Sequence, residues 1–152
     1  MSKELIHLMT DASFCSTTQV GTFGFQFTSP LGQIKGGCGL FNNPKDSLAA
    51  ELGAILEALN FAERCNLLVK NAVLIVHCDN LSVVNYLRGG VISRVDLIAL
   101  LNSILGLAYR FKIKIVSRHV KGHAKKKDRK QRLQHYCDTI ARKQLRKVKV
   151  AA

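Results

Sequence analysis

Tryptophan, proline and long apolar runs are scarce in this sequence. Its 152 residues include 2 Pro and no Trp, and no apolar run approaches the roughly 20 residues that a membrane span requires. The first residues lack the basic-then-apolar order of a secretory signal. We therefore expect a chain that neither crosses nor binds a membrane. The length fits one domain, over residues 1–152.

Cysteine is present but not in a pattern that builds structure. The 5 Cys are an odd number, and no two of them are spaced as Cys-x-x-Cys. Neither a disulfide framework nor a zinc knuckle is indicated. We expect reduced thiols in a cytoplasmic protein.

Acidic residues are few, and basic residues gather at one end of the chain. Residues 1–109 hold 7 Lys and Arg against 8 Asp and Glu, a net charge of −1, whereas residues 110–152 hold 16 against 2, a net charge of +14. A positive field of this density favours a polyanionic partner. A solubilising surface or a disordered basic tail would show the same pattern.

Hydrophobic periodicity predicts an alternation of strands and helices. Period-2 alternation and β-branched runs indicate strands, and longer Ala- and Leu-rich segments indicate helices. The predicted strands cover residues 5–10, 20–28, 33–41, 72–77 and 112–117, and the predicted helices cover 48–64, 81–87, 95–109 and 129–147. This order predicts an α/β domain in which the first three strands are antiparallel and the first, fourth and fifth are parallel.

Four of the acidic residues stand where a surface role does not explain them. Asp11 and Asp79 follow apolar strands, Glu51 lies within an apolar helical stretch, and Asp138 borders the apolar stripe of the last helix. A buried lone carboxylate is costly unless it is paired or binds a metal. Asp11 and Asp79 would be neighbours, at the ligand-binding edge of the sheet, if their two strands are adjacent.

The segments around these residues resemble the type 1 ribonuclease H family. They are Met9–Ser13, Ala50–Leu52, His77–Asn80, Val120–Ala124 and Cys137–Arg142. They occur in the family's order and extend over residues 5 to 145. The resemblance implies the ribonuclease H-like fold, a five-stranded mixed sheet with helices on both faces.

The resemblance also implies an activity and a cofactor. Members of the family are endonucleases that cut the RNA strand of an RNA–DNA hybrid and leave a 5′-phosphate and a 3′-hydroxyl. It assigns two Mg²⁺ ions, with Mn²⁺ as a substitute, to Asp11, Glu51, Asp79 and Asp138, and it gives His123 a catalytic role. The physics agrees, because clustered carboxylates either raise their pKa values or capture cations, and Mg²⁺ prefers oxygen ligands.

Further residues are candidates for contact with the hybrid. Basic residues near His123 are expected to bind phosphates in a salt-sensitive way: Lys121, Lys125, Lys126, Lys127 and Arg129. Three polar residues are candidates for contact with 2′-hydroxyl groups, which distinguish RNA from DNA: Ser13, Asn80 and Gln134. Nothing in the sequence demands more than a monomer.

Two alternatives remain open. A related nuclease, such as a junction resolvase or a DNA exonuclease, would share the carboxylates, although Lys121–Ala124 favours the hybrid-cutting branch. A non-catalytic module that binds nucleic acid on the same fold is the other alternative, and the four intact carboxylates argue against it.

Overall fold

The computed structural model describes residues 3–31, 33–121, 137, 139, 141–143 and 146. Within this part, five strands and three helices follow one another in the predicted order. They are β1 (Leu5–Cys15), β2 (Val20–Thr28), β3 (Ile34–Asn42), α1 (Ser47–Arg64), β4 (Val73–Cys78), α2 (Leu81–Leu87), α3 (Val95–Arg110) and β5 (Lys114–His119). No helix of the described residues is long and apolar enough to cross a lipid bilayer.

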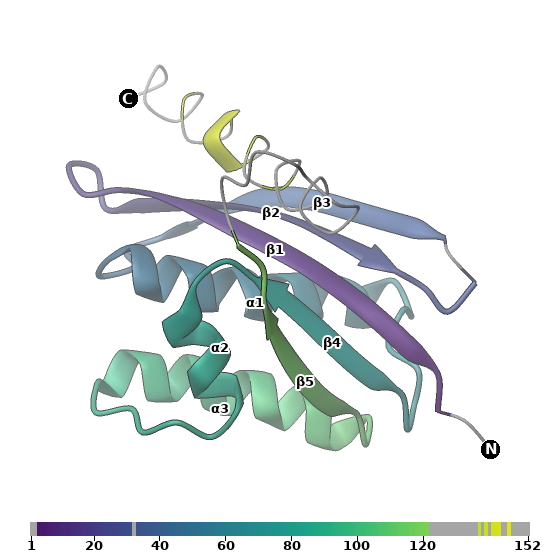
Figure 1. The fold of residues 1–152 in the computed structure, drawn as a ribbon. Coiled ribbons are helices and arrows are strands. Elements are labelled where there is room, and N and C mark those ends of the chain that lie inside the picture. The colour runs from purple at the N-terminus through teal and green to yellow at the C-terminus, as the bar shows by residue number, and fades with distance from the viewer. Residues whose placement is uncertain are drawn as a thin grey trace.

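The five strands form one mixed sheet in the order β3-β2-β1-β4-β5 (Figure 1). β1 pairs antiparallel with β2, and β2 pairs antiparallel with β3. β4 pairs parallel with β1 on one side and with β5 on the other. The predicted sheet class is therefore confirmed, including the adjacency of β1 and β4 on which the meeting of Asp11 and Asp79 depends.

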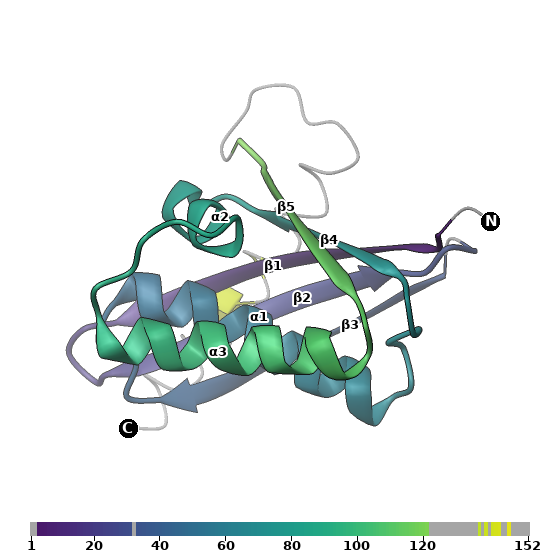
Figure 2. The same cartoon turned by 90° about the horizontal axis from the view of Figure 1, so that it is seen from below.

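Helices α1 and α3 lie across one face of this sheet (Figure 2). The alternate residues Phe23, Phe25 and Phe27 of β2 are buried in the same core cluster as α1, and the rings of Phe25 and Phe61 meet edge to face with centroids 4.9 Å apart. Burial of such aromatic and aliphatic side chains is the main force that holds the helices to the sheet.

Residues near the C-terminus cover the other face. Cys137 and Ala141 have helical backbone. Cys137 forms a buried cluster with Met9 and Val120, and the Thr22 hydroxyl donates a hydrogen bond to the Ala141 carbonyl at 2.5 Å. Helices thus cover both faces, as expected. The rest of the helix predicted over residues 129–147 lies outside the described residues.

β3 and β4 are each shifted by one residue from the prediction, β5 is shifted by two, and β1 is five residues longer. β1 runs on to Cys15 instead of ending before Asp11, because residues 11–15 continue the ladder with β2. β5 begins at Lys114, not at residue 112, because α3 continues to Arg110. Lys112 then has a φ of 53°, a left-handed conformation that interrupts extended backbone.

Candidate active site

The register of the sheet brings Asp11 and Asp79 to the same level. The parallel pairing of β1 with β4 ends at the pair Met9 and His77. Asp11 and Asp79 each stand two residues beyond that pair, on strands that run in the same direction. The Asp11 side chain is only 3% exposed. Asp11 was predicted at the carboxyl end of its strand and instead lies within β1, at the point where β1 continues beyond β4.

Glu51 reaches the same place from α1. The side chain of Asp46 caps this helix by accepting a hydrogen bond from the Ala49 backbone N–H at 3.0 Å, so the helix begins at Ser47 and carries Glu51 in its second turn. The Glu51 side chain is 8% exposed, on a helix face buried against the sheet. It shares a hydrogen bond with the Asp11 side chain and accepts one from the Ala12 backbone N–H.

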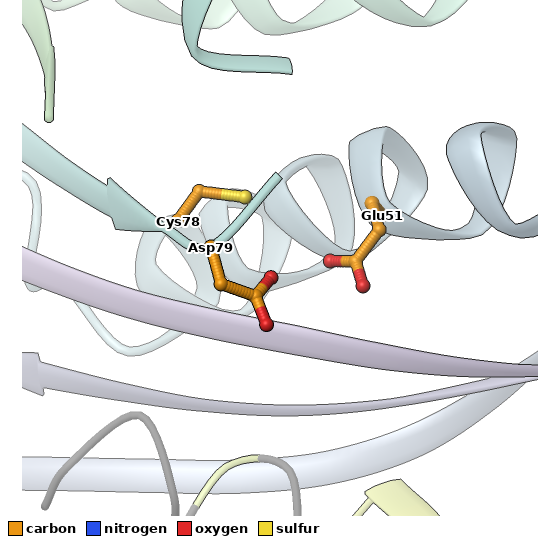
Figure 3. A group of neighbouring side chains, drawn as sticks. All are labelled: Glu51, Cys78 and Asp79. Atoms are coloured by element: carbon orange, nitrogen blue, oxygen red, sulfur yellow. The ribbon is translucent and has the colours of Figure 1, made fainter. Parts of the chain in front are cut away.

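Asp79 completes a tight group with Glu51 and Cys78 (Figure 3). One ligand atom of each, a carboxylate oxygen or the Cys78 sulfur, lies within 4.8 Å of the others. The position of Asp79 is fixed from both sides, because it follows β4 directly and precedes Asn80, whose side chain caps α2 by accepting from the Val83 backbone N–H at 3.2 Å.

The crowding of carboxylates perturbs Glu51 strongly. Burial raises the pKa of Glu51 well above its usual value of 4.5, and the negative charges of Asp11 and Asp79 and the hydrogen bond with Asp11 raise it further. The Ala12 N–H acts in the opposite direction but is the smallest contribution. A carboxyl group pushed this way either keeps its proton or needs a cation beside it.

One atom of the site has a need that the described residues do not meet. Glu51 Oε2 is buried and has no hydrogen-bond partner among them. A buried polar atom of this kind costs about 1–3 kcal/mol and calls for an explanation such as a bound ion. The donor set of Asp11, Glu51 and Asp79, all carboxylates, suits a hard divalent cation such as Mg²⁺. These residues therefore fit a metal site.

The other predicted site residues divide into two groups. Ser13 lies on β1 two residues beyond Asp11, and Lys121 lies exposed just after β5. The rest lie outside the described residues: His123, Lys125, Lys126, Lys127, Arg129, Gln134 and Asp138. The residue before Asp138 is described, and the Cys137 thiol donates a hydrogen bond to the Met9 carbonyl at 3.7 Å. Met9 stands two residues before Asp11.

His119 is a neighbour of the site that the sequence analysis missed. Its Nε2 lies 3.0 Å from the backbone carbonyl oxygen of Asp79, and because a carbonyl oxygen only accepts, Nε2 is the donor. The register pairs His119 with Cys78 across β4 and β5. The available signal was that His119 follows the strand predicted over residues 112–117. That strand, β5, in fact ends two residues later, at His119. Cys78 was also missed, because the cysteines were considered only as reduced thiols without a structural pattern.

A mixed sheet in this strand order, with carboxylates from β1, α1 and β4 at one place, is the arrangement of the ribonuclease H fold. The reverse transcriptase-like family matches residues 9–141, and the chain belongs to this ribonuclease H-like family. No curated protein is significantly similar to the chain in sequence.

Solved structures with the same fold span nearly the whole chain. RNase H1 from the archaeon Halobacterium salinarum superposes with a TM-score of 0.74 at 18% identity, over 94% of this chain and 98% of that one. The N-terminal RNase H domain of a Mycobacterium tuberculosis protein gives 0.71 at 17% identity, over 99% and 100%. LC11-RNase H1 from compost, solved in complex with an RNA/DNA hybrid, gives 0.70 at 16% identity, over 92% and 99%.

Proposed function

We propose that this protein is a metal-dependent endoribonuclease that hydrolyses the RNA strand of RNA–DNA hybrids. The observation that carries the proposal is that Asp11 of β1, Glu51 of α1 and Asp79 just after β4 meet, with one buried oxygen of Glu51 lacking a hydrogen-bond partner among the described residues. Like charges are not brought together in a fold without a cation or a proton to offset them. The family membership and the hybrid bound to LC11-RNase H1 direct the proposal to this substrate.

The roles of the residues follow from their chemistry. Asp11, Glu51, Asp79 and Asp138 would hold two divalent ions, Mg²⁺ or in its place Mn²⁺. Two such ions supply activation of the attacking water and stabilisation of the leaving 3′-oxygen, which leaves a 5′-phosphate on the product. His123 is proposed to relay a proton, because histidine is the side chain that most commonly acts as a general acid or base.

The substrate is proposed to be held by residues on either side of the carboxylates. Lys121, exposed just after β5, would begin a series of phosphate contacts that continues through Lys125, Lys126, Lys127 and Arg129. Ser13, Asn80 and Gln134 are proposed to contact the 2′-hydroxyl groups. Phosphate contacts of this kind predict an affinity that falls steeply with salt.

The decisive test is cleavage of an end-labelled RNA–DNA hybrid with and without Mg²⁺, by the wild type, Asp11→Asn and Glu57→Gln. Asp11→Asn should abolish cleavage while hybrid binding persists. Glu57 lies on α1 outside the carboxylate group, so Glu57→Gln should cleave at the wild-type rate. If the wild type binds the hybrid but cleaves nothing in Mg²⁺ or Mn²⁺, the protein is a binding module instead.

Duplex DNA and a four-way DNA junction belong in the same assay at equal concentration. The hybrid should be cut at least tenfold faster than either of them. A preference for the junction would assign the protein to the resolvases, and stepwise shortening of duplex DNA would assign it to the exonucleases.

A further inference from the structure

A thiol stands among the carboxylates of the candidate active site. Cys78 is the last residue of β4, its side chain is fully buried, and its sulfur lies within 4.8 Å of an oxygen of both Glu51 and Asp79. Figure 3 shows the Cys78 sulfur directed from β4 toward the side of Glu51. Mg²⁺ does not use sulfur as a ligand. The thiol therefore adds nothing to the proposed nuclease chemistry. It packs in the hydrophobic core, and its sulfur also stands within reach of two carboxylates.

The Glu51 carboxyl group of this cluster is a second sign of a ligand. Glu51 is more than nine-tenths buried, and its Oε2 has no hydrogen-bond partner among the described residues. The group of three thus offers one soft and two hard donor atoms on a helix and a strand end. Mixed sulfur and oxygen donor sets are typical sites for Zn²⁺ and chemically similar soft cations.

We propose that Glu51, Cys78 and Asp79 form a site for a soft divalent cation of the Zn²⁺ and Cd²⁺ class. Ligand bonds of about 2.3 Å to sulfur and about 2.0–2.2 Å to oxygen set neighbouring donors roughly 3.6 Å apart in a tetrahedral site. The three ligand atoms, at most 4.8 Å apart, reach that spacing with small side-chain rotations. Binding replaces the S–H bond by a sulfur–metal bond, and the proton leaves to solvent.

Such a cation would compete with the ions of the nuclease reaction, because Glu51 and Asp79 are common to both sites. This regulatory consequence rests on the proposed function, whereas the binding itself does not. Soft cations should therefore inhibit hybrid cleavage at concentrations well below those of the Mg²⁺ present.

The binding test uses Cd²⁺ alone, without nucleic acid. The parent is Cys38→Ser/Cys65→Ser, which removes the two exposed thiols and leaves the buried ones. Titration with Cd²⁺ should give an ultraviolet sulfur-to-metal charge-transfer band that saturates at one equivalent. Adding Cys78→Ser should remove the band and weaken binding at least tenfold. Adding Cys15→Ser, a buried thiol four residues beyond Asp11, should leave both unchanged.

Two further variants protect the test against misfolding. Cys78→Ala avoids burying a hydroxyl and should also lose the band, while thermal melting reports whether each variant is folded. Glu51→Gln retains every thiol and should weaken Cd²⁺ binding at least tenfold. A band that survives in folded Cys78→Ser or Cys78→Ala, or the absence of a band in the parent, overturns the proposal.

Inhibition separates this proposal from the proposed nuclease function. With Mg²⁺ and the labelled hybrid, the Cd²⁺ concentration for half-inhibition should be at least tenfold lower for the parent than for Cys78→Ser. A parent that binds Cd²⁺ through Cys78 but never cleaves the hybrid would refute the nuclease function and leave the metal site standing. A parent that cleaves the hybrid but shows no Cd²⁺ band would support the nuclease function and refute the soft-metal site.

Discussion

The sharpest consequence of the carboxylate group is that Glu51 destabilises the metal-free fold. Replacing it by glutamine keeps the shape of the side chain and removes its charge. We expect Glu51→Gln to melt at a higher temperature than the wild type in EDTA at pH 7, although most single substitutions at buried positions destabilise. The reason is that burial and the charges of Asp11 and Asp79 all raise the pKa of Glu51.

The size of the effect follows from the geometry in two ways. Unit charges on Glu51 and Asp79, whose nearest oxygens lie within 4.8 Å of each other, repel by at least about 3.5 kcal/mol at an effective dielectric of 20. Protonation limits the penalty: from a usual pKa of 4.5, holding the proton at pH 7 costs about 3.4 kcal/mol at 1.36 kcal/mol per unit. The buried glutamine amide destabilises the variant by about 1–2 kcal/mol, which reduces its advantage. The net gain is then about 1–2 kcal/mol, or a melting temperature higher by about 2–8 °C.

The pH dependence has a definite sign. Burial raises the pKa of Glu51 in the folded state. Below the unfolded pKa of about 4.5 the Glu51 carboxyl is protonated and does not destabilise the fold. Stability is then lost as pH rises through the raised pKa. The glutamine does not titrate. The advantage of Glu51→Gln should therefore shrink when the pH is lowered from 7 to 5.

Calorimetric or circular dichroism melts in EDTA at pH 5, 6 and 7 provide the measurement. Glu57→Gln is the matched control, because Glu57 lies on the same helix and not in the carboxylate group. Its free energy of unfolding should stay within about 0.5 kcal/mol of that of the wild type. A Glu51→Gln variant that melts at or below the wild-type temperature at pH 7, or whose advantage grows toward pH 5, would refute the reasoning.

Two more predictions concern the fold that supports the site. Gly39→Ala should destabilise by about 1–3 kcal/mol in urea unfolding, because its new Cβ would lie 2.7 Å from Phe23 Cζ. Gly106→Ala, in helical backbone with nothing within 4 Å, should stabilise by about 0.5–1 kcal/mol, and equal effects would contradict the packing argument. Asp46→Ala should cost about 1 kcal/mol through loss of the α1 cap. Asp46→Asn keeps the cap but loses the ion pair with Arg94 at 2.6 Å. That hydrogen bond lowers the pKa of Asp46 below its usual 3.8, so the gap between Asp46→Asn and the wild type should close in acid melts as pH falls below 3.8.

The sequence allowed the sheet and its helices to be predicted because their patterns are local. The alternation through residues 20–28 predicted β2 with the observed ends. The helix predicted over residues 81–87 also has the observed ends of α2. The far half of β1 was missed because residues 11–15 are extended only through their pairing with β2. This pairing is a local hairpin, from Asp11 opposite Gly24 to Cys15 opposite Val20, and the prediction ended the strand too early, where the apolar run gives way to Asp11.

The site was predicted in the same uneven way. Carboxylates in apolar surroundings are conspicuous, so Asp11, Glu51 and Asp79 could be selected from composition and position alone. Cys78 and His119 could not, because each has an ordinary explanation as a core thiol or a strand-end residue. Cys78 adjoins Asp79 in the sequence, but only the folded structure shows its sulfur near Glu51. Only the register between β4 and β5 shows that His119 stands beside Asp79.

The cost of the carboxylate group and its affinity for cations arise from the same charges. A ligand that binds only the folded chain at 100 times its Kd stabilises it by about 2.7 kcal/mol, which is close to the penalty worked out for Glu51. The wild type should therefore gain more stability from saturating Mg²⁺ than Glu51→Gln does. The difference between their melting temperatures should then shrink or change sign. A protein in which the carboxylates served only the fold would show no such exchange, because removing a structural contact does not make the metal-free chain more stable.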